Sequence, residues 1–493
     1  MPPQIATLLF AAGILGLFVL NKDKKARTSP ALWLPVIWLA IAGSRMASQW
    51  VAAISSGSTT HYSAEQLLDG NPFDRALLTG LMLLGMVVLI RRGRKVVTLL
   101  QANVPIIVFF LYCGLSAAWS DYSDVSFKRW IKALGDLIMV LIVLTDLDPS
   151  AAVKRLMTRV GFVLAPASIL VSKYYTHLGR GFGEGGEGYY TGVTTSKNEL
   201  GGICLLFGLG SVWSLSSYFR ENKNSRRRGL LVAQSVLLAM VLWLIWKAQT
   251  MTALACFFMA SVVLIATRLP AITRRTWVIH ALIVLMILVS ASALFLGVGS
   301  GLLTTMGKDA TLTGRTAVWD LVLSLAKNPL VGTGFESFWL GPRLEKIWSV
   351  YWWHPNEAHD GYIEVYLNLG WIGVSLLAVL LVTGYRTAIG ALRRDPESAG
   401  FRLALFLVAV TYNFTESAVR IMHPVWICFL LGTIAVPGGW VRTKVKKPVA
   451  LAPTQELSPY LDEDQNASIQ DQPSGVSQVK PAFCAPLAWA RMP

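Results

Sequence analysis

Long apolar runs dominate this chain and set the strongest limit on its fold. A helix needs about 17–25 mainly apolar residues to cross a bilayer, and about thirteen stretches approach or reach that length. Lipid offers the backbone no hydrogen-bond partner, so such stretches span as helices. We therefore predict an all-α polytopic membrane protein with about 12–13 transmembrane helices. The candidate spans are 4–20, 31–54, 74–90, 103–119, 133–147, 157–173, 198–216, 229–247, 250–267, 277–297, 361–384, 401–414 and 420–437.

Composition supports this class and excludes others. The chain is 54% hydrophobic and 15% charged, whereas soluble domains carry about 25% charged residues. The net charge is +16, but the basic residues form short clusters between apolar runs, where orientation signals occur. We therefore expect no nucleic-acid partner. The five cysteines have no paired spacing, so neither a disulfide framework nor a cysteine metal site is indicated.

The basic clusters also orient the spans. With the N-terminus outside and 4–20 as the first span, Lys and Arg gather in alternate loops, as the positive-inside rule requires. The exceptions are Lys128, Arg129 and Lys132, which fall on the outside. The predicted inside loops lie near 21–30, 91–102, 148–156, 217–228, 268–276, 385–400 and from 438 onward, and the outside loops include 55–73, 120–132, 174–197 and 298–360.

Two outside loops differ in composition from the rest of the chain. Residues 174–197 are rich in glycine, which favours a flexible lid. In 298–360, the apolar spacing of Ala317–Lys327 predicts an amphipathic helix on the membrane face, and Trp339, Trp348, Trp352 and Trp353 suit the headgroup level. We predict a helical bundle over 1–447. The Pro-, Ser- and Asp-rich segment 448–493 is expected to be a disordered cytoplasmic tail.

His359 is the first candidate for catalysis. It lies two residues before the span that begins at Gly361, so its imidazole should face water at the membrane boundary and accept a proton from a hydroxyl near neutral pH. A solvated loop histidine is the alternative. The spacing of His354, Glu357 and His359 matches no zinc motif, and Pro355 opposes a helix there. We therefore predict no metal.

Other polar residues could hold an anion or support the site. Arg315, Arg180 and Lys197 are outside-facing cations suited to a diphosphate, although each could instead contact headgroups. Glu184, in the glycine-rich loop, could pair with a base or bind an acceptor sugar. Glu416 and Arg420 are four residues apart and could form a helical ion pair.

An ordered set of short motifs resembles the O-antigen ligase/O-antigen polymerase superfamily. Spacing and order match over roughly 100–437, although no single motif is specific. Ala117–Ser120 is similar to a segment of the exopolysaccharide (succinoglycan-type) polymerase branch. The motifs are Thr195–Gly201, Gly314–Thr316 with Trp319, Asn328–Gly334, Ala358–Asp360 with Tyr362, Gly370 and Gly373, and Asn413–Ser417.

The resemblance implies an inverting, metal-independent glycosyltransferase without a cofactor. Its donor would be a glycan on undecaprenyl diphosphate, and its site would lie on the periplasmic side of a bacterial inner membrane. His359 would be the essential loop histidine and Arg315 the loop arginine, while Arg180, the upstream arginine, and Lys197 would hold the diphosphate. Asn198, Glu184, Glu416 and Arg420 would support them. The expected partners are the donor, a glycan acceptor, membrane lipids and other polysaccharide assembly and export proteins.

Three other functions fit the same sequence. A ligase would pass finished glycan to lipid A-core or to protein. A transporter of lipid-linked sugar would use charges within the membrane, with its site near the midplane. A scaffold of a polysaccharide-export complex would need no catalytic histidine. The segment around Trp119 and the glycine-rich loop favour the polymerase over the ligase, and the unusual residues in the outside loops argue against a transporter.

Overall fold

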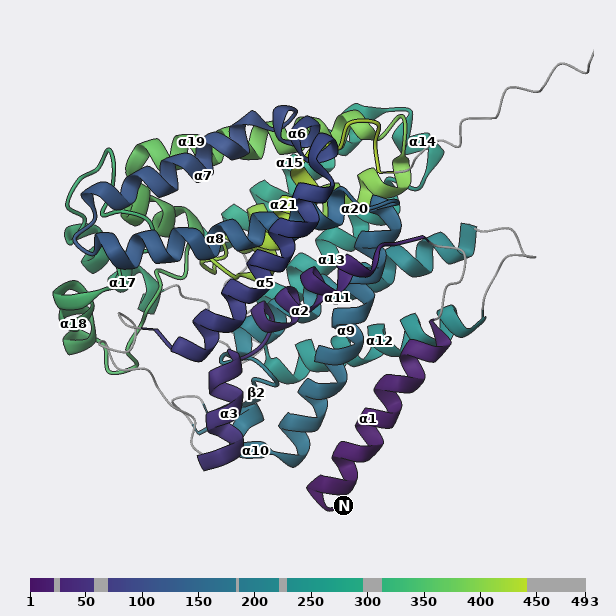
Figure 1. The fold of residues 1–493 in the computed structure, drawn as a ribbon, viewed down its shortest axis with the longest axis horizontal. Coiled ribbons are helices and arrows are strands. Elements are labelled where there is room, and N and C mark those ends of the chain that lie inside the picture. The colour runs from purple at the N-terminus through teal and green to yellow at the C-terminus, as the bar shows by residue number, and fades with distance from the viewer. Residues whose placement is uncertain (22–26, 57–69, 183–185, 221–227, 296–312, 441–493) are drawn as a thin grey trace, which may run out of the picture. The chain divides into compact units, whose positions relative to one another are not determined.

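The computed structural model describes residues 1–21, 27–56, 70–182, 186–220, 228–295 and 313–440, all within the compact unit Met1–Arg442. The described residues are almost entirely helical, which confirms the all-α prediction (Figure 1). Positions 296–312, the tail 448–493 and Glu184 lie outside the described residues.

The helices before the glycine-rich loop are α1 (Pro3–Leu20), η1 (Pro30–Leu32), α2 (Trp33–Ala42), α3 (Ala47–Ser56), α5 (Pro72–Arg91), α6 (Gly93–Gln101), α7 (Val104–Leu115), η2 (Ser116–Trp119), α8 (Ser123–Leu144), α9 (Pro149–Tyr174) and α10 (Thr176–Gly179). The loop carries strands β1 (Arg180–Phe182) and β2 (Gly188–Tyr190). Then follow α11 (Lys197–Arg220), α12 (Arg228–Ala248), α13 (Met251–Ala266), α14 (Pro270–Thr273), α15 (Thr276–Phe295), α17 (Thr313–Ser324), α18 (Gly341–Val350), α19 (Gly361–Ala391), α20 (Pro396–Tyr412) and α21 (Pro424–Thr433).

Six of the described helices are long and apolar enough to cross a membrane, or eight if each bent pair forms one span. This is fewer than the predicted twelve or thirteen. Helix α8 carries several charges, and α13, α20 and α21 are shorter than a full span. These four helices are therefore not included in the count. The chain is a multi-pass membrane protein in either count.

The predicted span 31–54 is broken. Helices α2 and α3 meet at an angle of 59°, and Gly43, Ser44 and Arg45 lie between them. The guanidinium of Arg45 donates to the carbonyl oxygens of Leu178 (2.7 Å) and Gly192 (3.2 Å). The charged side chain therefore ties the break to the segment around the β-hairpin, which satisfies a buried cation.

Two sets of loops gather at opposite ends of the bundle. At one end, Asp146 accepts from the backbone N–H of Ser29 (3.0 Å) and pairs with Arg92 (3.3 Å), and Lys154 pairs with Glu397. These residues lie in or beside the predicted inside loops. At the other end, the predicted outside loops meet, since Asp121 pairs with Lys327 at 2.9 Å and with Arg343. Figure 1 shows α17, α18, β2 and α10 at this second end, away from α14.

The predicted amphipathic helix is present as α17, and part of its apolar face packs into the protein. In α17, Val318 and Val322 are buried against Leu344 and Ile347 of α18. Trp339, expected at headgroup level, is buried and its indole N–H donates to Glu364 (2.8 Å). These apolar residues thus share one buried cluster with α18 and with Leu367 of α19, which the sequence analysis did not predict.

Helix α19 is interrupted at Gly370, where the 328–334 motif packs against it. Gly370 has a φ of 63°. The N–H groups of Trp371 and Ile372, which lose helical partners at the break, donate instead to Pro329 (2.8 Å) and Leu330 (3.1 Å). The backbones approach so closely that a Cβ on Gly370 would lie 2.3 Å from the Leu330 carbonyl carbon. The 328–334 motif therefore supplies the hydrogen-bond acceptors that the interrupted helix lacks. Its glycines allow the two backbones to approach closely.

We predict that Gly370→Ala destabilises the protein by at least about 2 kcal/mol, because the left-handed φ and the clash with Leu330 add. Thermal unfolding in detergent, followed by size exclusion, measures this. Gly390→Ala is the matched control, since Gly390 lies in the same helix with nothing within 4 Å. Equal midpoints for the two variants would contradict the assignment of Gly370 to the packing of this break.

Candidate active site

The carboxylate of Glu416 connects three distant segments. Glu416 lies in the loop between α20 and α21 and is 6% exposed. Its Oε1 accepts from the amide of Asn198 at the start of α11 (2.8 Å) and pairs with Arg315 of α17 (3.3 Å). Its Oε2 lies 3.5 Å from Nδ1 of His359. Arg315 also donates to the carbonyl oxygen of Thr415, which fixes the guanidinium beside the loop.

A second carboxylate flanks the same imidazole. Glu357 Oε1 lies 3.2 Å from His359 Nδ1, and Oε2 lies 2.6 Å from Arg420. Arg420 in turn lies 3.7 Å from Glu199 in the first turn of α11. Nδ1 of His359 makes no hydrogen bond to either flanking carboxylate. Its contacts with Glu357 and Glu416 are therefore ion-pair contacts. The network is defined here as Glu199, Arg315, Glu357, His359, Glu416 and Arg420.

The backbone around His359 is held on both sides. The N–H of Ala358 donates to Glu364 (3.0 Å), and its carbonyl accepts from the Trp319 indole (2.8 Å). Asp360 caps α19 by accepting from the N–H groups of Tyr362 and Ile363, both at 2.8 Å. Between these anchors His359 adopts a φ of 51°, a conformation that L residues rarely take. The sequence around the motif thus aims the imidazole at the two carboxylates.

The charges of the network favour a proton on His359. Burial alone lowers the pKa of His359, but the carboxylate of Glu357 and then that of Glu416 raise it, and the net shift is upward from 6.5. Three carboxylates face two guanidinium groups, so an imidazolium would balance the charge. The neighbouring Asp360 has its pKa raised to about 6, mainly by burial. His359 is therefore suited to accept a proton and hold it.

A cavity of about 910 Å³ adjoins the network. Arg420 and Glu199 line it, as does Trp353, whose ring lies 5.9 Å from the His359 ring. Trp348 and His354 stack at 4.8 Å on the same wall. Aromatic faces beside a few polar groups are typical of small-molecule sites. The volume is sufficient for several sugar rings.

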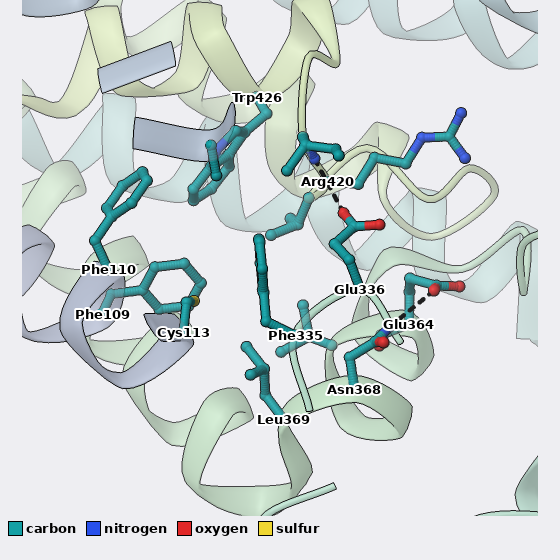
Figure 2. A pocket seen from close by; sticks show the side chains of 14 residues that line it. Phe109, Phe110, Cys113, Phe335, Glu336, Glu364, Asn368, Leu369, Arg420 and Trp426 are labelled. Carbon is teal, nitrogen blue, oxygen red and sulfur yellow. Dashed lines mark hydrogen bonds between the residues drawn. The ribbon is translucent and has the colours of Figure 1, made fainter. Parts of the chain in front are cut away.

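A smaller apolar pocket lies behind Arg420. Figure 2 shows Phe109, Phe110 and Trp426 on one side of it and Glu336 and Glu364 on the other. Glu336 accepts from the N–H of Ile421 (3.0 Å) and so anchors the loop that carries Arg420. This pocket measures about 20 Å³, which is too small for a sugar.

The structure brings together some of the predicted residues and separates others. His359, Arg315, Glu416, Asn198 and Arg420 share the network or touch it. Glu416 and Arg420 do not form the predicted helical pair, because both lie in the non-helical loop 413–423 and each has another partner.

Arg180 and Lys197 lie outside the network. Arg180 donates to the Ser172 carbonyl (2.8 Å) and sits 5.1 Å from the Tyr190 ring. Lys197 lies 4.9 Å from the Tyr189 ring. Neither forms an ion pair within the described part of the chain. Where a flexible lid was expected, residues on either side of 183–185 pair as strands β1 and β2.

Sequence reasoning missed two carboxylates and a histidine. Glu199 and Glu336 entered no site prediction, and His423, which lines the cavity, was not considered. Its Nδ1 accepts from the N–H of Val425 (3.2 Å). Burial, and then the Arg420 charge, lower the pKa of His423 to about 3, so it stays neutral. Glu199 lies inside the Thr195–Gly201 motif. Its charge at the end of a predicted span was the signal that could have marked it as a site residue.

The arrangement also contains a possible set of metal ligands. Glu357, His359 and Glu416 offer ligand atoms within 4.8 Å of one another, which the spacing in the sequence did not suggest. However, Arg315, Asn198 and Arg420 already bind these two carboxylates. A cation there would have to compete with two guanidinium groups, so these residues fit an imidazole-centred charge network better than a metal centre.

Two known groups of proteins are similar to this chain. Residues 224–378 match the O-antigen ligase family, a range that contains both Arg315 and His359. The chain is also similar to the exopolysaccharide production protein ExoQ of Rhizobium meliloti (strain 1021), at 26% identity over 323 residues, covering 62% of this chain and 70% of that protein. With the helical membrane architecture, these matches support the resemblance of this chain to the O-antigen ligase superfamily and to its exopolysaccharide branch.

Proposed function

We propose that the chain polymerises oligosaccharide repeats linked to undecaprenyl diphosphate, as an inverting glycosyltransferase at the periplasmic face of the bacterial inner membrane. The observation that carries this proposal is His359 held between two carboxylates, beside Arg315 and an aromatic-walled cavity. The family and its exopolysaccharide relative support an enzyme of polysaccharide production.

The proposed reaction uses the two faces of the imidazole differently. Nδ1 faces Glu357 and Glu416, which leaves Nε2 to take the proton of an acceptor hydroxyl. The hydroxyl oxygen attacks the anomeric carbon of the donor as the bond from that carbon to the diphosphate oxygen breaks. The electron pair leaves with undecaprenyl diphosphate, and the carboxylates stabilise the imidazolium. Arg315 and Arg420, which pair with the two flanking carboxylates, supply positive charge around the imidazole as the diphosphate departs.

Two alternatives remain as outcomes of one experiment. The name of the matched family favours a ligase, which would attach finished polymer to lipid A-core or to another acceptor. In a deletion strain, accumulation of single lipid-linked repeats supports the polymerase, and unattached long polymer supports the ligase. A transporter is less favoured, because the described charges of the network gather in loops at one end of the bundle rather than at its midplane.

We predict that His359→Ala lowers polymer formation by at least about 10²-fold, the usual contribution of a general base. The assay measures polymer length and rate with purified enzyme and lipid-linked repeats, after size exclusion shows that the variant folds. His280→Ala is the control, since His280 lies in α15 and bonds Tyr385. Normal polymer from the His359 variant would rule out the mechanism and favour a scaffold.

The dependence of activity on pH should report the effect of the carboxylates on His359. A base must be neutral to act, so activity should rise with pH through a midpoint above 6.5, because the pKa of His359 is raised. Glu357→Gln removes the larger upward influence and should move the midpoint to lower pH. Glu345→Gln, an exposed change on α18, should leave it in place. A midpoint unmoved by Glu357→Gln would contradict the role given to this carboxylate.

We predict that chelation does not inhibit the enzyme. Glu357 and Glu416 each pair with a guanidinium group, so activity should be retained after dialysis against EDTA. Metal analysis of the purified protein accompanies the assay. Loss of activity in EDTA that a divalent cation restores would instead assign Glu357, His359 and Glu416 as metal ligands.

A further inference from the structure

The outer half of α8 contains the three cations that break the positive-inside pattern, and two of them have partners. Lys128 pairs with Asp124 one turn earlier. Arg129 donates to the carbonyl oxygen of Glu336. Lys132 is half-buried and lines the large cavity. Within the described residues, no carboxylate lies within ion-pair distance of Lys132.

The fold places Lys132 beside the loop that carries Arg420. One helical turn further along α8, Asp136 accepts from the N–H of Met422 (2.9 Å) and from the Trp38 indole (2.7 Å). This docks the loop 420–425 onto α8. Arg420, His423 and Lys132 therefore line the same cavity. Because Nδ1 of His423 accepts a backbone N–H, the proton of the neutral ring lies on Nε2, which is a donor.

The cavity is lined differently along its length. Apolar lining comes from the end of α2, the second turn of α11 and the start of α21: Ile41, Ala42, Gly202, Ile203, Pro424 and Val425. Aromatic lining comes from the loop before α19 and from the hairpin: Trp348, Trp352, Trp353, Phe182 and Tyr189. An apolar wall, two cations and aromatic faces match an amphiphile that has a lipid tail, an anionic head and a sugar.

From this juxtaposition we infer that Lys132 is a substrate-binding residue, which holds the diphosphate of a polyprenyl-diphosphate-linked glycan inside the cavity together with Arg420. The inference rests on the proposed function and deepens it. It moves the diphosphate site from Arg180 and Lys197, which sit on the tyrosines of the hairpin, to the wall between α8 and the 420–425 loop. An ammonium group without a carboxylate partner can bind phosphate without first giving up an ion pair.

The test measures binding of undecaprenyl diphosphate to purified full-length protein in detergent, by native mass spectrometry or thermophoresis. Lys132→Gln should weaken binding about tenfold or more, the usual effect of losing a charged hydrogen bond. Lys132→Arg should restore much of it. Lys128→Gln, one turn away and already paired, is the matched control and should bind like the wild type. Equal thermal midpoints establish that the variants fold.

Further arms separate the sources of the anion. Undecaprenyl monophosphate should bind more weakly than the diphosphate, and phosphatidylglycerol binding should not depend on Lys132. If Lys132→Gln weakens phosphatidylglycerol binding equally, the site is a general headgroup site and the inference is overturned. In turnover assays, Lys132→Gln should raise KM for the lipid-linked donor and leave kcat nearly unchanged, unlike His359→Ala.

The two proposals fail in different ways. Wild-type binding of undecaprenyl diphosphate that is unchanged in Lys132→Gln overturns the assignment of Lys132 and leaves the proposed function standing. Absence of binding to the wild type overturns both. Binding that falls in Lys132→Gln and recovers in Lys132→Arg supports the cavity as the diphosphate site.

Discussion

The site depends on one carboxylate, that of Glu416, which Asn198 contacts across 218 residues and Arg315 across 101. A buried carboxylate is costly unless paired and hydrogen-bonded. Glu416 meets this requirement by drawing the start of α11, helix α17 and the loop before α19 to a single point. Removing Arg315 would leave the buried charge of Glu416 without its guanidinium partner, and removing Asn198 would cost the carboxylate a hydrogen bond. The position of His359 follows from that requirement rather than from the flexibility of a surface loop.

The polar loops can meet because the spans beneath them are interrupted at positions where other parts of the protein bind the exposed backbone groups. The break at Gly370 is filled by the 328–334 motif, whose carbonyl oxygens accept the N–H groups that the helix cannot satisfy. The break between α2 and α3 is bridged by Arg45 and borders the cavity. Irregular backbone at membrane depth is tolerated where it is covered by protein or lines a cavity. These two interruptions meet that condition.

Much of the fold follows from local sequence, and the site follows only in part. Apolar length predicts spans such as α5, α9 and α11, because each helix satisfies its own backbone. It fails for α8, where the cations mask a helix that begins at Ser123, and for α18, whose apolar side faces α17 instead of lipid. Motif resemblance points to His359 and Arg315, which the structure places beside the same carboxylate. It includes Glu199 in the Thr195–Gly201 motif without indicating its role, and it leaves out Glu336, since their roles arise from long-range pairing with Arg420 and Ile421.

Backbone strain gives independent support for the location of the site. Among the described residues, five other than glycine have positive φ, and four of these, Glu336, His354, His359 and Met422, lie in or beside the network and cavity. Each such conformation costs about 1–2 kcal/mol. It persists only where surrounding contacts fix it, and such residues cluster at functional sites. Here the contacts are visible: Glu336 accepts from Ile421, Met422 donates to Asp136, and Asp360 caps the helix after His359. These strained conformations set the backbone direction at His359 and in the loop that carries Arg420. They therefore help to orient the imidazole, the guanidinium of Arg420 and the cavity wall toward one another.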